Sequence, residues 1–182
     1  MAKLISKTYG EALFEIAMEG QKTDLFLQEA QDILTILDEN PELDKLMKHP
    51  KVSRQEKEQV LDNVFLGNVS REMTGFMKLL INKERYSELP KIFQYLIERI
   101  REERKIGTAY VTTAVELSTE KKAAIQKRLL ETTEYKTIDV YYDVDQTIIG
   151  GMIIRIKDRV VDSSVRTKLE EMKKQLLQIQ LG

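Results

Sequence analysis

The chain has 182 residues, of which 42% are hydrophobic and 32% are charged, and it contains no cysteine. Its 29 lysines and arginines nearly balance its 30 aspartates and glutamates, so bulk electrostatic capture of nucleic acid is excluded, as are disulfides and thiolate chemistry. No apolar run approaches the roughly 20 residues of a membrane-spanning helix, and the N-terminus lacks the apolar stretch of a secretory signal, so we expect a cytoplasmic protein.

Residues 1–105 show apolar stripes of helical period separated by short breaks. Each stripe occupies one side of its segment, as in a helix that packs on its neighbours. The pattern predicts six amphipathic helices joined by short loops, which together form an α-helical bundle. Residues typical of helix caps and ends mark the breaks: Thr23, Asn40-Pro41, the capping-box pair Ser53 and Glu56, Gly67, Ser70 and Ser87.

After Gly107 the apolar period changes from near four to two. Alternation over residues 109–117, 138–144 and 152–156 predicts strands. Ser118 is expected to cap a helix between the first two strands, and a last helix is expected from about Ser164 to Gln180. Residues 106–182 therefore predict a small β-α-β-β-α module. The fold class is α+β, mainly α, with the domain boundary at about residue 105.

The run from Gly150 to Arg166 holds the most informative local pattern. After the strand, Lys157 to Arg159 can turn, and Val160-Val161 can return along the sheet as a very short strand. Asp162 and Ser163 are both expected as N-caps of the last helix. An anion could also bind at this helix start beside Arg166, but the Asp162 carboxylate would occupy the same N–H groups, so a structural cap is favoured.

Groups for catalysis or metal binding are sparse. The single histidine, His49, precedes Pro50 at a helix end, where we expect it to interact with the helix dipole; without a cysteine or second histidine nearby it is a poor metal ligand. There is no nucleophile elbow, Walker A loop or dinucleotide fingerprint. Tyr110 and Tyr141 are predicted on strands and could stack on bases, but the negative charge of Asp139 near them disfavours nucleic-acid binding. The sequence predicts no catalytic residue, no cofactor and no metal site.

The first and fifth predicted helices carry more apolar residues than one stripe needs, including Phe14 and Ile16 on the first and Phe76 and Leu79 on the fifth. The surplus is explained either by deeper burial or by a groove that receives a partner's helix. The last helix leaves the same choice between a core stripe and an exposed seam. Both alternatives stay open at this point.

Three stretches carry a resemblance to one family. The run from Tyr9 to Ala17, YGEALFEIA, resembles the family's first helix, and the run from Asn82 to Pro90, NKERYSELP, resembles its turn between the fifth and sixth helices. The run from Gly151 to Leu169 is similar to its C-terminal signature, in which Gly151, Asp162, Ser164 and Arg166 are structural residues and Ser163 stands where glycine is frequent. The family is the delta subunit of F-type ATP synthases, called the oligomycin-sensitivity-conferring subunit in mitochondria.

The resemblance implies a non-catalytic stator role, in which the chain ties the catalytic head to the peripheral stalk so that rotor torque is resisted and proton transport is coupled to ATP synthesis. It implies that a groove between helices one and five receives the N-terminal helix of an alpha subunit. It also implies that the C-terminal module engages the C-terminal ends of the b subunits. One copy per complex is implied, at the cytoplasmic face of the bacterial membrane, which it would meet only through the complex.

The resemblance assigns these contacts to particular residues. The alpha-subunit helix is expected on Tyr9, Ala12, Leu13, Ile16, Phe76, Leu79 and Leu80. The b subunits are expected on Val165, Leu169, Met172 and Leu176. The alternative is a helix-binding adaptor of another assembly, which would show the same surfaces without a membrane complex. A small hydrolase or nucleotide-binding protein has no motif to support it.

Overall fold

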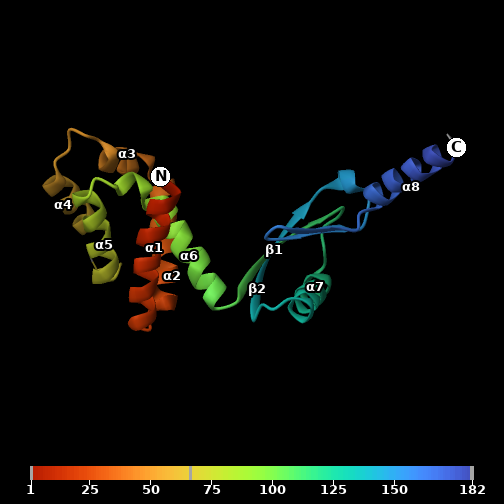
Figure 1. Ribbon diagram of the computed structural model, residues 1–182, viewed down its shortest axis with the longest axis horizontal. Coiled ribbons are helices and arrows are strands. Elements are labelled where there is room, and N and C mark those ends of the chain that lie inside the picture. Colours follow the sequence, from red (N-terminus) through yellow and green to blue (C-terminus); the bar gives the residue numbers. More distant parts are fainter. Residues whose placement is uncertain (1, 66, 181–182) are drawn as a thin grey trace. The chain divides into compact units, whose positions relative to one another are not determined.

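The computed structural model describes residues 2–65 and 67–180. Within these residues the chain is mainly helical and has a small four-stranded mixed sheet (Figure 1). It divides into two compact units, Met1–Ile100 and Arg101–Gly182, which are described separately. They are called unit 1 and unit 2.

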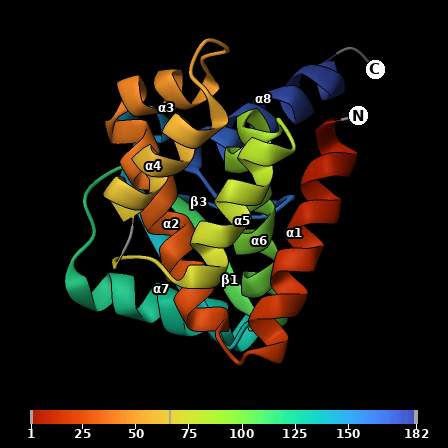
Figure 2. The ribbon, with the colours of Figure 1, turned by 90° about the vertical axis from the view of Figure 1, so that its left-hand side faces the viewer.

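Unit 1 is built from helices that surround one apolar core (Figure 2). A short 3-10 turn, η1 (Tyr86–Glu88), precedes the last of them. The helices are α1 (Ala2–Glu19), α2 (Thr23–Glu39), α3 (Pro41–Lys48), α4 (Arg54–Phe65), α5 (Arg71–Asn82) and α6 (Leu89–Glu103), whose last turn passes into unit 2.

Two of the predicted helix starts are confirmed by their hydrogen bonds. At α4 the Ser53 hydroxyl accepts from the Glu56 N–H at 3.2 Å, and a Glu56 carboxylate oxygen accepts from the Ser53 N–H at 2.8 Å. This reciprocal pair is the capping box that the sequence predicts. At α5 the Ser70 hydroxyl accepts from the Met73 N–H at 3.3 Å, as an N-cap does.

Two other predicted starts are wrong by one or two residues. Thr23 is the first residue of α2 rather than its cap; the cap position belongs to Lys22, whose side chain makes no capping bond. The Lys22 N–H donates to the Ala17 carbonyl at 2.8 Å, so the end of α1 fixes where the chain turns into α2. Ser87 lies inside η1, and α6 begins at Leu89.

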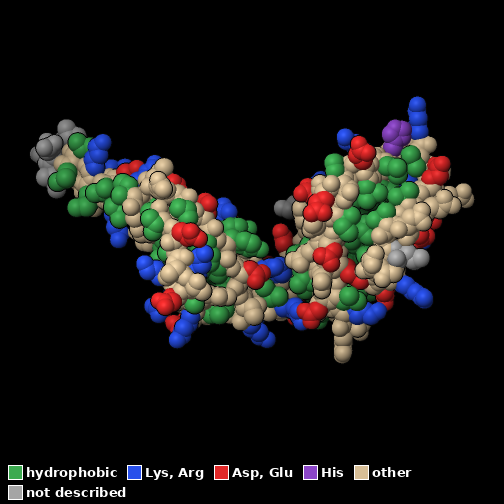
Figure 3. Space-filling view, turned by 180° about the vertical axis from the view of Figure 1, so that it is seen from behind, with side chains coloured by type: hydrophobic (Ala, Val, Ile, Leu, Met, Phe, Trp, Pro, Cys, Tyr) green, Lys and Arg blue, Asp and Glu red, His purple; other side chains and the backbone are tan. Residues whose placement is uncertain are grey.

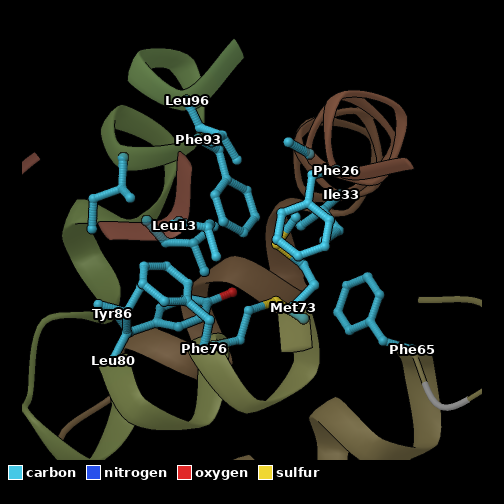
Figure 4. Packing of buried hydrophobic residues seen from close by; sticks show 14 of the residues in the cluster. Leu13, Phe26, Ile33, Phe65, Met73, Phe76, Leu80, Tyr86, Phe93 and Leu96 are labelled. Atoms are coloured by element: carbon cyan, nitrogen blue, oxygen red, sulfur yellow. The ribbon is translucent and has the colours of Figure 1, made fainter. Parts of the chain in front are cut away.

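The core of unit 1 is made of large side chains from all of its helices. Figure 4 shows aromatic and aliphatic groups meeting at its centre. Phe26, Phe65 and Phe93 are each almost fully excluded from solvent. Burial at this level contributes roughly 1.5–3 kcal/mol for each large apolar side chain. The core therefore fixes the face that each helix turns outward.

Unit 2 is a four-stranded sheet with a helix on one face. Strand β1 pairs in parallel with β2 and antiparallel with β3, and β3 pairs antiparallel with β4, which gives the order β2-β1-β3-β4. A 3-10 turn, η2 (Gln146–Ile148), leads into β3. The other elements are β1 (Ile106–Thr113), α7 (Thr119–Thr132), β2 (Thr137–Val144), β3 (Met152–Ile156), β4 (Arg159–Asp162) and α8 (Val165–Gln180).

The first strand is shorter than its sequence pattern predicts. Alternation continues to Leu117, but β1 ends at Thr113, because that residue pairs with Val144, the last residue of β2. The chain then has no strand beside it to extend the ladder. On the covered face of the sheet, Ala109 packs with Ile138 and with Leu129 of α7. The short return predicted at Val160-Val161 is confirmed as part of β4.

Candidate functional site

Two large aliphatic side chains on α1 and α5 remain in contact with solvent. Ile16 of α1 is 46% exposed and Leu79 of α5 is 43% exposed. Ala12, one turn before Ile16, is exposed as well, and Tyr9 is half-buried. Figure 2 shows α1 and α5 on the same side of the unit, flanking α6. These four residues, Tyr9, Ala12, Ile16 and Leu79, are called the α1–α5 surface.

The other residues expected at this place lie in the core. Leu13 is 1% exposed, Leu80 is fully buried, and Phe76 is 9% exposed. Figure 4 shows all three among the core side chains. Their α-helical neighbours Ile16 and Leu79 turn outward from the same two helices. The structure thus divides the seven predicted residues into three that are buried, three that are exposed, and Tyr9, which is half-buried.

An aromatic chain joins the core to the α1–α5 surface. The Tyr9 ring meets the Phe76 ring edge-on, with 6.3 Å between their centroids, and Phe76 stacks on Phe93 at 6.2 Å. Tyr9 comes from α1, Phe76 from α5 and Phe93 from α6. Such pairs add to the energy of area burial and have preferred geometry. The three rings therefore hold α1 and α5 in a fixed arrangement on α6.

Helix α8 presents its apolar stripe to solvent. Figure 3 shows hydrophobic side chains gathered along it. The exposed fractions rise from 38% at Val165 to 64% at Leu176. The spacing of four, three and four residues keeps the stripe on one side of the helix, as in a coiled-coil seam. The stripe, called the α8 seam, consists of Val165, Leu169, Met172 and Leu176. Leu177 is also exposed beside it.

The start of α8 is held by a compact set of hydrogen bonds. Ser164, and not Asp162 or Ser163, is the N-cap: its hydroxyl accepts from the Thr167 N–H at 3.2 Å. Asp162 accepts from the Ser164 N–H at 2.8 Å and from the Thr167 hydroxyl at 2.7 Å. Those bonds, with the Ser164 N–H first, lower the pKa of Asp162. The predicted caps are displaced because Asp162 belongs to β4, whose pairing delays the helix.

Gly151 is required by the same junction. Its φ of +78° favours glycine, and a Cβ there would lie 2.4 Å from the Ser163 carbonyl oxygen. The Nε of Arg166 donates to a carboxylate oxygen of Glu170, one turn further along α8, at 3.2 Å. Asp162 accepts from the Ser164 N–H, Ser164 caps the Thr167 N–H, and Arg166 is paired to Glu170, so the described contacts make this helix start a structural junction.

The remaining candidates from the sequence have structural surroundings. His49 is at the C-terminal end of α3, where its Nδ1 accepts from the Lys51 N–H at 3.2 Å. Across residues 2–65 and 67–180, no group of three or more acidic, histidine or cysteine side chains could hold a metal ion. In the same residues, no helix has the length and apolar character to cross a membrane.

Comparison with known proteins places the chain in a family. Residues 5–176 match the family model described as ATP synthase delta (OSCP) subunit. The ATP synthase subunit delta of Lachnoclostridium phytofermentans is 48% identical over 182 residues, which cover all of both chains. That of Clostridium beijerinckii is 31% identical over 177 residues, covering 97% of this chain and 98% of the relative.

The fold is found in a solved complex as well. A chain in the cryo-EM structure of the Toxoplasma gondii mitochondrial ATP synthase hexamer matches with a TM-score of 0.72. The match covers 94% of this chain and 97% of that one at 18% sequence identity. The protein therefore belongs to the ATP synthase delta (OSCP) subunit family, whose members are non-catalytic subunits of the peripheral stalk of F-type ATP synthase.

Proposed function

We propose that this stalk subunit links the alpha subunits of the catalytic head to the b subunits through two separate surfaces. The six helices within residues 1–105 act as one bundle that receives the N-terminal helix of an alpha subunit. The module of residues 106–182 engages the C-terminal ends of the b subunits. One copy serves each complex at the cytoplasmic face of the bacterial membrane, and it meets the membrane only through its partners.

The observation that carries the first contact is the exposure of Ile16 and Leu79 on two helices of one side of unit 1. Each is flanked along its helix by fully buried neighbours, such as Leu13 and Leu80, so the helices are held rigidly while these two side chains face water. An amphipathic helix laid on them would remove apolar area from water at about 25 cal/mol per Å². The buried residues of the predicted set contribute by holding α1 and α5 in place.

The α8 seam supports the second contact. Its four side chains repeat with coiled-coil spacing and are exposed along the described part of the helix. A helix with such a stripe gains free energy only by packing against a second apolar surface. Two attachments on one chain also raise the overall avidity, because the second binding event becomes intramolecular. A stator that must resist torque benefits from this arrangement.

The test of the first contact replaces Leu79 by aspartate. L79D leaves the fold intact because the side chain is already exposed, and it weakens binding of a synthetic peptide that spans the N-terminal helix of the cognate alpha subunit. Leu46 of α3 is the matched control, since it is 38% exposed and its helix packs on α2 and η1. Calorimetric titration of the full chain should show loss with L79D and none with L46D. Equal binding by both variants would overturn the proposed surface.

The assembly itself is tested by affinity capture from gently solubilised membranes of the source cell, read by mass spectrometry. Joint recovery of alpha, beta and b subunits with the tagged chain is the expected result. Capture of unrelated proteins with those subunits absent would favour the adaptor of another assembly.

A further inference from the structure

Gly75 is the one glycine of α5, and it faces solvent in the middle of that helix. Glycine is the least favourable residue in a helix interior apart from proline, because it has the most backbone freedom to lose. A helix-interior glycine therefore needs a reason. Within a protein the usual reasons are a positive φ or a neighbour too close to admit a side chain.

The fold of this chain supplies neither reason at Gly75. Its φ is not positive, and a Cβ placed there would find no atom within 4 Å. Gly10 of α1 is the contrast, since its Cβ would lie 2.4 Å from the Tyr95 ring. Among the glycines that the structure describes, Gly75 alone combines an ordinary backbone with open space. An alanine would fit there and would suit the helix better.

The position of Gly75 relates it to the proposed docking surface. It precedes Leu79 by four residues, so the two lie one turn apart on the same side of α5. Glu72, one turn earlier on that side, is paired with Lys22, which follows α1. Between Glu72 and Leu79 the exposed side of α5 therefore presents bare backbone, with no atom within 4 Å of a Cβ placed at Gly75.

We infer that Gly75 is the specificity-determining point of closest approach between α5 and the docked alpha-subunit helix. This inference rests on the proposed function and adds to it the residue that selects the partner. The bare backbone at Gly75 lets one large apolar side chain of the docked helix approach α5 and pack beside Leu79. A side chain at position 75 would hold the two helices apart and would cost contacts along the whole interface.

The test is a substitution whose effects on stability and binding have opposite signs. Gly75→Ala should raise the Tm of the full chain by about 2–6 °C, because alanine favours the helix and has room. The same variant should weaken binding of the synthetic alpha-subunit peptide by about tenfold, as overpacking does. Gly75→Leu should weaken it further. If the glycine had a purely structural role, Gly75→Ala would change the Tm and leave the affinity for the peptide unchanged.

Thr35→Ala is the control, since Thr35 is exposed in α2 and its hydroxyl donates to the Gln31 carbonyl of its own helix. It should raise the Tm without changing the affinity. Tight binding by the wild-type chain with equal binding by G75A would overturn the role of Gly75 and leave the proposed surface standing. A lower Tm for G75A would also overturn it. Failure of the wild-type chain to bind the peptide would overturn both proposals.

Discussion

Glu29 of α2 holds the first turn of α5 through Ser70. One carboxylate oxygen accepts from the Ser70 N–H at 2.6 Å, and the other accepts from the Ser70 hydroxyl at 2.7 Å. The Ser70 hydroxyl in turn accepts from the Met73 N–H and caps the helix. Glu29 is only 6% exposed, so these bonds are shielded from competing water. A buried carboxylate on one helix therefore orients the cap of another, and with it the direction of the helix that carries Leu79.

Replacing Glu29 by alanine should lower the free energy of unfolding by about 1–3 kcal/mol, because it leaves the partly buried N–H and hydroxyl of Ser70 without their carboxylate acceptor. Urea unfolding followed by circular dichroism measures the change as a shift of the midpoint. Gln28→Ala is the control, since Gln28 is exposed on the same helix. Equal midpoints for the two variants would contradict the role assigned to Glu29.

Gly10→Ala should destabilise the protein, although alanine is the better helix former. The new Cβ would lie 2.4 Å from Cδ1 of Tyr95, and that ring is held by its hydroxyl, which donates to a Glu11 carboxylate oxygen at 2.7 Å. Overpacking of this kind costs about 1–3 kcal/mol. G75A is the matched control, with the same change and the opposite expected sign.

A double-mutant cycle with Tyr95→Ala tests the cause of the Gly10 effect. If the clash with the ring is responsible, G10A should cost much less in the Y95A background than in the wild type. Additive losses across the cycle would show that the Gly10 position is sensitive for another reason.

Stability should fall at alkaline pH because of Tyr86. Burial raises the pKa of its hydroxyl, and the nearby charge of Asp44 raises it further. In the unfolded chain the hydroxyl loses its proton near pH 10, so above that pH unfolding releases a proton. The free energy of unfolding then decreases by about 1.4 kcal/mol per pH unit until the folded-state pKa is reached.

Tyr86→Phe removes this proton and should flatten that part of the profile. Urea midpoints at pH 8, 9, 10 and 11 for both proteins give the comparison, since the other tyrosines titrate in each. The difference between the two proteins should be constant below pH 9 and should change above pH 10 in favour of the variant. Parallel profiles over the whole range would contradict the assignment to Tyr86.

Leu176→Glu should abolish binding to the b subunits and leave stability nearly unchanged. The side chain is mostly exposed, and surface substitutions of this kind usually change the free energy of unfolding by no more than about 0.5 kcal/mol. The charge would lie at the C-terminal end of the α8 seam, within the proposed helix contact. Gln175→Glu adds the same charge beside the α8 seam and is the control. Sedimentation with the purified cytoplasmic part of the b subunits separates the outcomes, and retained binding by L176E would exclude the seam.

The sequence determined much of the local structure because local signals are short in range. Ser53 and Glu56 lie three residues apart and cap each other in the structure as their spacing predicts. The change of period after Gly107 marks the first strand, and the resemblance of three separate runs identified the family that the comparisons show. Each of these signals is contained within a few consecutive residues or within one continuous pattern.

The tertiary structure decided which apolar residues are buried. Leu13 and Ile16, or Leu79 and Leu80, are equally apolar and lie within a few residues of each other, yet one of each pair is in the core and the other faces solvent. Periodicity finds a helix with two apolar sides, but it does not say which side meets the other helices. Only the neighbours in space decide that.

The two helix-interior glycines show the same division. In the sequence, Gly10 and Gly75 are the same residue in the same kind of segment. In the structure one faces a tyrosine ring, and the other faces open space. The sequence by itself determined the elements, their order and the family, because these follow from contiguous patterns. The tertiary structure alone decided burial, close approach and the exposed surfaces, because each depends on residues far apart in the chain.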